Sequence, residues 1–140
     1  SFEMAHALKG YDGPCRNIHG HSYKLFVTVI GKPSENQDDP KLGMLIDFAD
    51  LKRLVTEHIV SVFDHAFVLS EQSVITECHH NHELFSRVIY VPFQPTCENL
   101  VADFAGRIIS ILPGNAKLHH LRLFETATSF TEWYASDNNI

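Results

Sequence analysis

No stretch of this 140-residue sequence approaches the ~20 consecutive apolar residues that a membrane-spanning helix needs, so we predict no membrane contact. Basic residues are also few. Eleven Lys and Arg stand against 17 Asp and Glu, for a net charge of −6, and they do not cluster. Because nucleic-acid binders neutralise phosphates with clustered Lys and Arg, this balance argues against that class. The opening residues lack the basic and then apolar pattern of a signal peptide, and we expect none.

Cysteine is scarce as well. The three cysteines are an odd number and lie far apart, which argues against a disulfide framework. Free thiols are typical of a reducing cytoplasm, where we expect the protein to act. Histidine, in contrast, is abundant, with ten residues. Because histidine is the common zinc ligand and titrates near neutral pH, this excess directs the search for a site.

The length and the hydrophobic fraction of 44% are typical of one globular domain, which we predict over residues 1–140. Alternating or β-rich patterns predict strands at residues 1–7, 21–30, 87–91, 117–125 and 130–135, the last two joined as a hairpin. Apolar residues at helical spacing predict two helices. Asp47 is the expected N-cap of the first, residues 48–63, and Thr96 of the second, which Pro113 and Gly114 end. We therefore predict an α+β domain with both helices on one face of the sheet.

Two histidines two residues apart are the first sign of chemistry. His19 and His21 stand at the entry to a strand, where residues i and i+2 point to the same side. Catalytic zinc usually takes three protein ligands and keeps one position open. The best third candidate is His6, on the preceding strand. A lone histidine is more often an ordinary surface or core residue, but this arrangement favours a metal site.

A thiol lies close to these histidines in sequence. Nearby positive charge lowers the pKa of a thiol from ~8.5, so Cys15 beside a bound zinc ion could act as a base or nucleophile. It could equally be a fourth zinc ligand or an inert loop thiol. Cys97, in the first turn of the second helix, has a weaker case. The polar segment 71–83 is predicted to be an exposed loop, and its Cys78 to His82 cluster is best interpreted as solvated.

Three acidic residues complete the candidates. Asp64 precedes His65, and a carboxylate beside an imidazole can orient the ring and stabilise its charged form. Glu98 and Glu125 could each accept two N–H bonds from a pterin or guanine edge. For both of them, an ordinary solvated surface acid is the alternative.

Taken together, these residues resemble the family of 6-pyruvoyltetrahydropterin synthase and 6-carboxytetrahydropterin synthase. Six pieces match in order and span nearly the whole chain: Phe2-Glu3-Met4-Ala5-His6, Cys15 with His19-Gly20-His21-Ser22-Tyr23, Gly43-Met44-Leu45-Ile46-Asp47-Phe48, Phe63-Asp64-His65, Pro95-Thr96-Cys97-Glu98-Asn99, and Glu125-Thr126. Any one piece is unspecific, whereas six in this order make a strong resemblance.

The resemblance implies a tunnelling fold, with a four-stranded antiparallel sheet and two helices on one face. Three subunits would close a barrel, and two trimers would stack into a homo-hexamer with sites at subunit interfaces. The resemblance also implies the role of each site residue: His6, His19 and His21 as zinc ligands, Cys15 as catalytic base, Asp64 and His65 as a second proton-transfer unit, Glu125 as the anchor of the pterin ring, and Thr96, Cys97 and Glu98 as the lining of its pocket.

The implied substrate is 7,8-dihydroneopterin triphosphate, whose side-chain hydroxyls zinc would polarise while bases remove protons. Only three residues separate Cys15 from His19, which is more similar to the bacterial 6-carboxytetrahydropterin synthases of queuosine biosynthesis. The expected enzyme is thus a zinc-dependent lyase that forms 6-carboxy-5,6,7,8-tetrahydropterin and releases triphosphate and acetaldehyde. The alternatives are a 6-pyruvoyltetrahydropterin synthase, a non-catalytic zinc or pterin-binding module, and a purely structural zinc domain.

Overall fold

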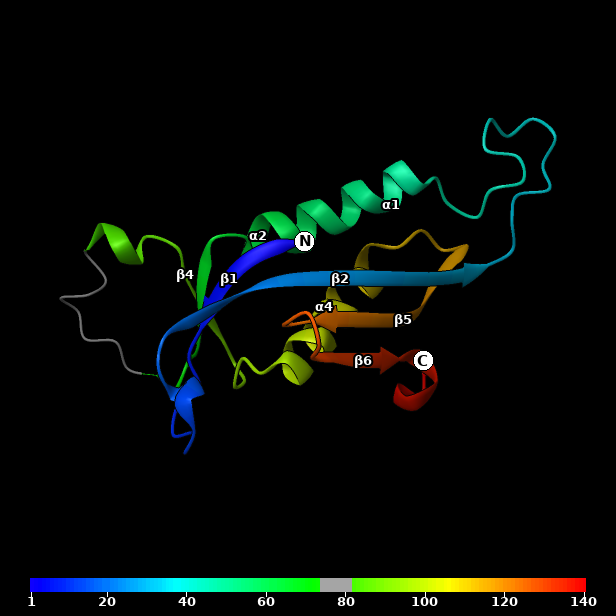
Figure 1. Ribbon diagram of the computed structural model, residues 1–140. Coiled ribbons are helices and arrows are strands. Elements are labelled where there is room, and N and C mark those ends of the chain that lie inside the picture. The colour runs from blue at the N-terminus through cyan, green and yellow to red at the C-terminus, as the bar shows by residue number, and fades with distance from the viewer. Residues whose placement is uncertain (74–81) are drawn as a thin grey trace.

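The computed structural model describes residues 1–73 and 82–140, and its framework is one six-stranded sheet in the order β4-β3-β1-β2-β5-β6 (Figure 1). The strands are β1 (Phe2–His6), β2 (His19–Gly31), β3 (Ala66–Ser70), β4 (Val88–Val91), β5 (Ala116–Phe124) and β6 (Phe130–Tyr134). Three short 3₁₀ turns accompany them: η1 (Pro14–Arg16), η3 (Glu83–Phe85) and η4 (Ala135–Asn138). The predicted hairpin at the C-terminal end is confirmed, since β5 and β6 pair antiparallel with Phe124 opposite Phe130.

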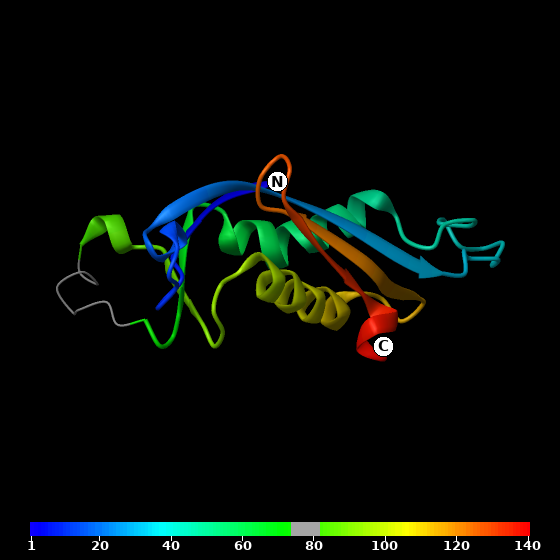
Figure 2. The ribbon, with the colours of Figure 1, turned by 60° about the horizontal axis from the view of Figure 1, so that its bottom comes forward.

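The helices lie together on one side of this sheet (Figure 2). The first is continuous through α1 (Phe48–Val55), a π-helical turn η2 (Thr56–Val60) and α2 (Ser61–Phe63). The second is α4 (Cys97–Ile111). Both predicted caps are confirmed: the Asp47 carboxylate accepts the Ala49 N–H at 2.7 Å, and the Thr96 hydroxyl accepts the Asn99 N–H at 3.3 Å. Side-chain caps of this kind satisfy N–H groups that have no partner within the helix.

The prediction of a four-stranded antiparallel sheet is wrong. The sheet has six strands and is mixed, because β3 pairs parallel with both β1 and β4. The chain leaves β2, crosses the helical layer through α1 and α2, and returns beside β1 in the same direction. β2 runs antiparallel to β1 and β3 reverses direction once more after the helices, so β3 runs parallel to β1. The predicted loop 71–83 lies partly outside the described residues, as does most of the Cys78 to His82 cluster.

Aromatic side chains join the helices to the sheet. Phe2 and Tyr23 stack with ring centroids 5.4 Å apart, and Phe104 from α4 meets Phe2 at 6.0 Å and Phe63 at 5.0 Å, both edge to face. Phe2 is 2% exposed, and Tyr23, Phe63 and Phe104 are fully buried. Large rings of this kind contribute much of the apolar area that stabilises a core. The core therefore lies under the middle of β1 and β2, and the histidines extend the same face toward one end.

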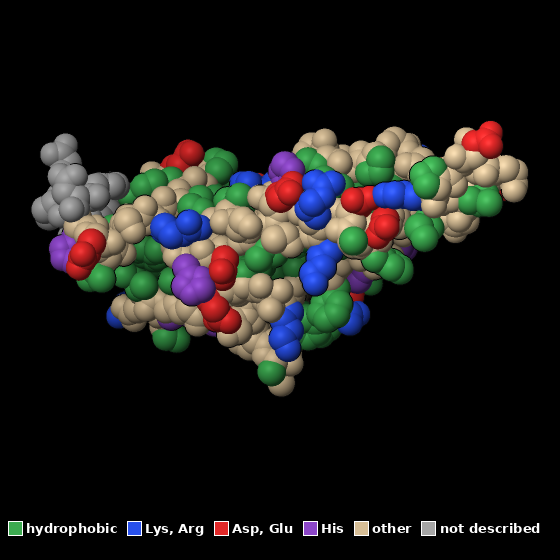
Figure 3. Space-filling view, turned by 90° about the horizontal axis from the view of Figure 1, so that it is seen from above, with side chains coloured by type: hydrophobic (Ala, Val, Ile, Leu, Met, Phe, Trp, Pro, Cys, Tyr) green, Lys and Arg blue, Asp and Glu red, His purple; other side chains and the backbone are tan. Residues whose placement is uncertain are grey.

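The described surface agrees with the composition. Acidic and basic side chains are interspersed on the face drawn in Figure 3, and Lys and Arg do not gather into a patch there. None of the helices within the described residues has the length and apolar character needed to cross a membrane.

Candidate metal centre and active site

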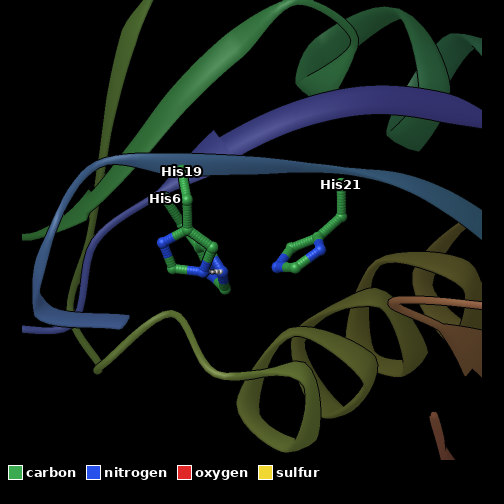
Figure 4. A group of neighbouring side chains, drawn as sticks. All are labelled: His6, His19 and His21. Carbon is green, nitrogen blue, oxygen red and sulfur yellow. Dashed lines mark hydrogen bonds between the residues drawn. The ribbon is translucent and has the colours of Figure 1, made fainter. Parts of the chain in front are cut away.

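Three histidines from two neighbouring strands point toward one another beneath the sheet (Figure 4). β1 and β2 pair antiparallel with His6 opposite His19 and Met4 opposite His21, so the three imidazoles share one face. The Nε2 atoms of His6 and His19 lie 3.0 Å apart. One ligand atom from each histidine lies within 4.8 Å of the others, and within residues 1–73 and 82–140 no other group of three potential ligands is so placed.

The hydrogen bonds of the rings determine where their lone pairs lie. The His6 Nδ1 lies 2.7 Å from the Pro95 carbonyl oxygen, and the His19 Nδ1 lies 2.8 Å from that of Asn17. Because a carbonyl only accepts, both Nδ1 atoms carry a hydrogen, so in the neutral form of either ring the Nε2 atom carries the lone pair that binds a metal. At 3.0 Å the two Nε2 atoms can share a hydrogen bond when one ring carries the proton, or can both face a metal cation when neither does. Two ligands of a tetrahedral zinc ion would lie about 3.3 Å apart, so this donor set fits such an ion.

Burial favours the metal-binding form of the innermost ligand. His6 is 2% exposed. Burial lowers its pKa below the ordinary 6.5, with the charges of His19 and His21 acting in the same direction and the Pro95 carbonyl and Glu125 opposing them. The neutral imidazole, which binds metal, is therefore the preferred form near neutral pH.

Glu125 is the acidic residue nearest to the histidines. It follows β5, and its Oε1 lies 3.6 Å from the His6 Nε2 and 3.7 Å from the His21 Nε2. The same oxygen accepts the Tyr23 hydroxyl at 3.3 Å. Burial raises the pKa of Tyr23 strongly, and Glu125 adds to the effect, so the phenol remains a donor. The carboxylate is thus oriented from one side while a quarter of the side chain stays exposed, which leaves acceptor capacity for a ligand.

The residues at the start of α4 have clear local roles. Thr96 caps the helix. The Cys97 thiol is buried, donates weakly to the Leu123 carbonyl at 3.5 Å, and accepts the Thr131 hydroxyl at 3.2 Å. Burial raises the pKa of Cys97 to about 11, so this thiol is protonated at neutral pH. Glu98 is exposed. Their expected place in a pterin pocket stays a prediction.

Cys15 lies in η1, partly exposed, in the loop between β1 and β2. Its carbonyl accepts the Leu8 N–H at 2.9 Å, which ties the loop to the end of β1. The expected role of Cys15 as catalytic base stays a prediction.

Asp64 and His65 form the expected pair, but they lie on the face of the sheet opposite to the three histidines. The His65 Nδ1 lies 3.0 Å from Asp64 Oδ2, and His65 has a φ of 59°, a left-handed conformation that is rare outside glycine. The main chain of Glu3 holds this turn, because its N–H donates to Asp64 Oδ1 at 2.9 Å and its carbonyl accepts the His65 N–H at 2.6 Å. The Glu3 N–H is also the main reason that the pKa of Asp64 is lowered.

His65 is 75% exposed and lines a cavity of about 540 Å³ with Glu3, Ala5 and Ser22. Side chains alternate along β1, so Glu3 and Ala5 point away from the face that carries His6. Within one chain, the structure therefore brings together the three histidines, Tyr23 and Glu125, and leaves the Asp64–His65 pair on the opposite side.

Two supporting groups have only a weak signal in the sequence. Tyr23 continues the i, i+2 series of His19 and His21, so alternation could have added it to the site. The Pro95 carbonyl acts through the main chain and lies 89 residues from His6, so no spacing rule would find it.

Comparisons with known proteins agree on one family. The profile described as 6-pyruvoyl tetrahydropterin synthase matches residues 1–136. A curated relative from Haemophilus influenzae, named 6-carboxy-5,6,7,8-tetrahydropterin synthase, is 37% identical over 95% of this chain and 93% of its own. A protein of the same name from Rickettsia typhi is 29% identical over 94% of this chain and 93% of its own.

Solved structures show the same fold. An uncharacterized protein from Wolinella succinogenes superposes with a TM-score of 0.74 at 20% identity, over 95% of this chain and 93% of that one. The 6-pyruvoyl tetrahydropterin synthase from Plasmodium falciparum superposes with a TM-score of 0.66 at 23% identity, over 96% and 91%. At these identities the likeness establishes the fold alone.

Proposed function

Since the chain belongs to the 6-pyruvoyl tetrahydropterin synthase family, we propose that it is a zinc-dependent 6-carboxytetrahydropterin synthase formed by residues 1–140. The reaction converts 7,8-dihydroneopterin triphosphate and water to 6-carboxy-5,6,7,8-tetrahydropterin, triphosphate and acetaldehyde. The names of the Haemophilus and Rickettsia relatives and the short separation of Cys15 from His19 support this product over a pyruvoyl one. The proposed setting is queuosine biosynthesis in the cytoplasm.

The observation that carries the proposal is the convergence of three imidazoles beside one carboxylate. His6, His19 and His21 would hold the zinc ion, which supplies Lewis-acid polarisation of the substrate's hydroxyls when bound. The Pro95 and Asn17 carbonyls keep two of the rings in the tautomer that binds metal. Glu125, oriented by Tyr23, would accept two N–H bonds from the pterin ring and so place the side chain of the substrate against the ion.

Proton transfer requires bases within reach of the substrate side chain. In this proposal the Cys15 thiolate removes one proton, favoured by the charge of the nearby ion. Asp64 orients His65 through the 3.0 Å contact and stabilises its charged form, so His65 could carry a second proton.

The position of Asp64 and His65 has a consequence for assembly. In one chain they lie on the face opposite the histidines, so they would serve a site built from a second chain's histidines. This supports the proposed homo-hexamer of two trimers, with each site completed across a subunit interface.

Product identification tests the proposal. The zinc-loaded protein is incubated with 7,8-dihydroneopterin triphosphate, and the products are separated and identified by mass. Acetaldehyde with 6-carboxytetrahydropterin is the expected outcome. A pyruvoyl pterin with triphosphate would assign the chain to the alternative synthase, whereas binding of zinc and pterin with no triphosphate release would indicate a non-catalytic module.

A further inference from the structure

The side chain of Gln94 bonds to the main chain of Lys9 as a neighbouring strand would. Its Oε1 accepts the Lys9 N–H at 3.2 Å, and its Nε2 donates to the Lys9 carbonyl at 2.7 Å. One primary amide thus pairs both main-chain groups of a residue 85 positions away. Such reciprocal pairing fixes the position and the orientation of the segment that it holds.

The held segment continues directly to the thiol. Leu8, the neighbour of Lys9, donates its N–H to the Cys15 carbonyl at 2.9 Å. Turn residues Gly10 and Gly13 lie between them in the loop, and Gly10 has a φ of 73°. Because the loop has little regular structure of its own, its link to Gln94 helps to hold it against the body of the protein.

The other end of the same contact is part of the metal centre. Pro95, which follows Gln94, is buried, and its carbonyl accepts the His6 Nδ1–H at 2.7 Å. The main chain at Gln94 is itself held by α4, because the Gln94 carbonyl accepts the Thr96 N–H at 2.8 Å and the Asn99 side-chain amide at 2.9 Å. Two consecutive residues just before α4, Gln94 and Pro95, therefore hold the thiol loop and His6.

We propose that Gln94 is a positioning residue that sets where the Cys15 loop lies relative to the three-histidine centre. The inference rests on the roles proposed above for Cys15 and the histidines. Gln94 is proposed to touch neither substrate nor ion. Gln94 holds Lys9, and the neighbouring Leu8 is bonded to Cys15, while Pro95 holds His6. The distance from the thiol to the three-histidine centre thus depends on the Gln94–Pro95 dipeptide.

The test compares two substitutions that differ in which contact they remove. Gln94→Met keeps the length of the side chain and removes both hydrogen bonds to Lys9. Lys9→Met is the matched control, because it removes the ammonium contact to the Gln72 carbonyl and leaves the Lys9 main chain paired with Gln94. Zinc content and the thermal midpoint of both variants are measured first, to establish that each is folded and loaded.

Two readouts then report on the position of the thiol. One is the ratio of the alkylation rate of Cys15 with zinc to that without zinc, followed on the Cys15 peptide by mass spectrometry. The other is kcat and KM. Because a misplacement of about 1 Å can cost about 100-fold in rate, we expect Gln94→Met to lower kcat by about 10- to 100-fold. Its KM should change by less than about three-fold, and its zinc-to-apo alkylation ratio should fall toward one.

Lys9→Met should match the wild type in both readouts. A Gln94→Met variant that keeps the wild-type ratio and kcat would overturn the inference, and so would equal losses in Gln94→Met and Lys9→Met. A wild-type ratio of one would also overturn it, since the thiol would then lie beyond the influence of the ion. If the ratio behaves as expected but no chain turns over the pterin, the positioning role stands and the proposed reaction fails.

Discussion

If the three histidines bind zinc as proposed, removal of the ion should destabilise this protein by a measurable amount. The Nε2 atoms of His6 and His19 lie 3.0 Å apart, and Glu125 lies 3.6 Å from the first of them. A divalent ion held there would bind these nitrogens and give the carboxylate a cation nearby. Because the three histidines lie on two paired strands and His6 is held by Pro95, the ion should bind the folded chain far better than the unfolded one.

The size of the effect follows from binding linkage. At free zinc about 1,000 times its dissociation constant, the folded state gains about 4 kcal/mol. A domain of this size shifts its thermal midpoint by roughly 3 °C per kcal/mol, so a strong chelator should lower the midpoint by roughly 10 °C. His19→Ala removes a ligand and should abolish most of the shift.

The assay is thermal unfolding followed by circular dichroism, with and without zinc, together with metal analysis. His119→Ala is the matched control, because this histidine is exposed on β5 and lies outside the metal centre. We expect His119→Ala to keep one zinc ion per chain and the full shift, and His19→Ala to lose both. Equal midpoints with and without zinc in the wild type, or an undiminished shift in His19→Ala, would refute the reasoning.

Four further outcomes are expected. Cys15→Ala should keep its zinc and lose about 100- to 10,000-fold in kcat, as for loss of a general base, and full activity would contradict the proposed role. Glu125→Gln should weaken pterin binding by about 10-fold or more in a fluorescence titration, because charge-assisted hydrogen bonds are lost. The pKa of Asp64 is lowered in the folded protein, so its carboxylate stabilises the fold above the unfolded pKa, and this contribution is lost as pH falls through the folded pKa. The urea midpoint should therefore fall in acid for the wild type, and Asp64→Asn should reduce that fall. Phe104→Ala, at a fully buried ring, should cost about 3–5 kcal/mol in urea unfolding, and a loss below about 1 kcal/mol would contradict the described packing.

Local patterns in the sequence predicted most of the elements. Alternation at Tyr23, Leu25, Val27 and Val29 predicted β2, and the caps at Asp47 and Thr96 predicted where the helices begin. These signals are local, because side-chain period and capping chemistry depend on residues a few positions apart. The histidine cluster was also predictable, since two ligands share one strand and the third lies on its immediate partner.

The arrangement that depends on distant contacts was not predictable in this way. The run from Ala66 to Ser70 is almost entirely buried and shows no alternation, so the period that identifies a half-exposed strand is missing. Its parallel pairing with β1 made the expectation of a four-stranded antiparallel sheet wrong. The π-helical turn at Thr56–Val60 interrupts a helix whose apolar spacing reads as regular. The hydrogen bonds from Gln94 and Pro95 join segments more than 80 residues apart, and no residue spacing in the sequence predicts them.

The three-residue segment from His19 to His21 borders both the metal centre and the cavity that His65 lines. The two histidines point toward the metal centre, while Gly20 between them borders the cavity that His65 lines on the other side. A Cβ at Gly20 would lie 3.3 Å from the Met4 carbonyl oxygen, so even a methyl group would disturb the cavity floor. Ser22, two positions on, faces the same cavity. Position 20 therefore has little room for a side chain, and His21 itself borders the cavity, so position 22 is where a side-chain change can reshape the cavity. Because the side chains alternate along the strand, such a change at position 22 need not move the imidazoles on the other face.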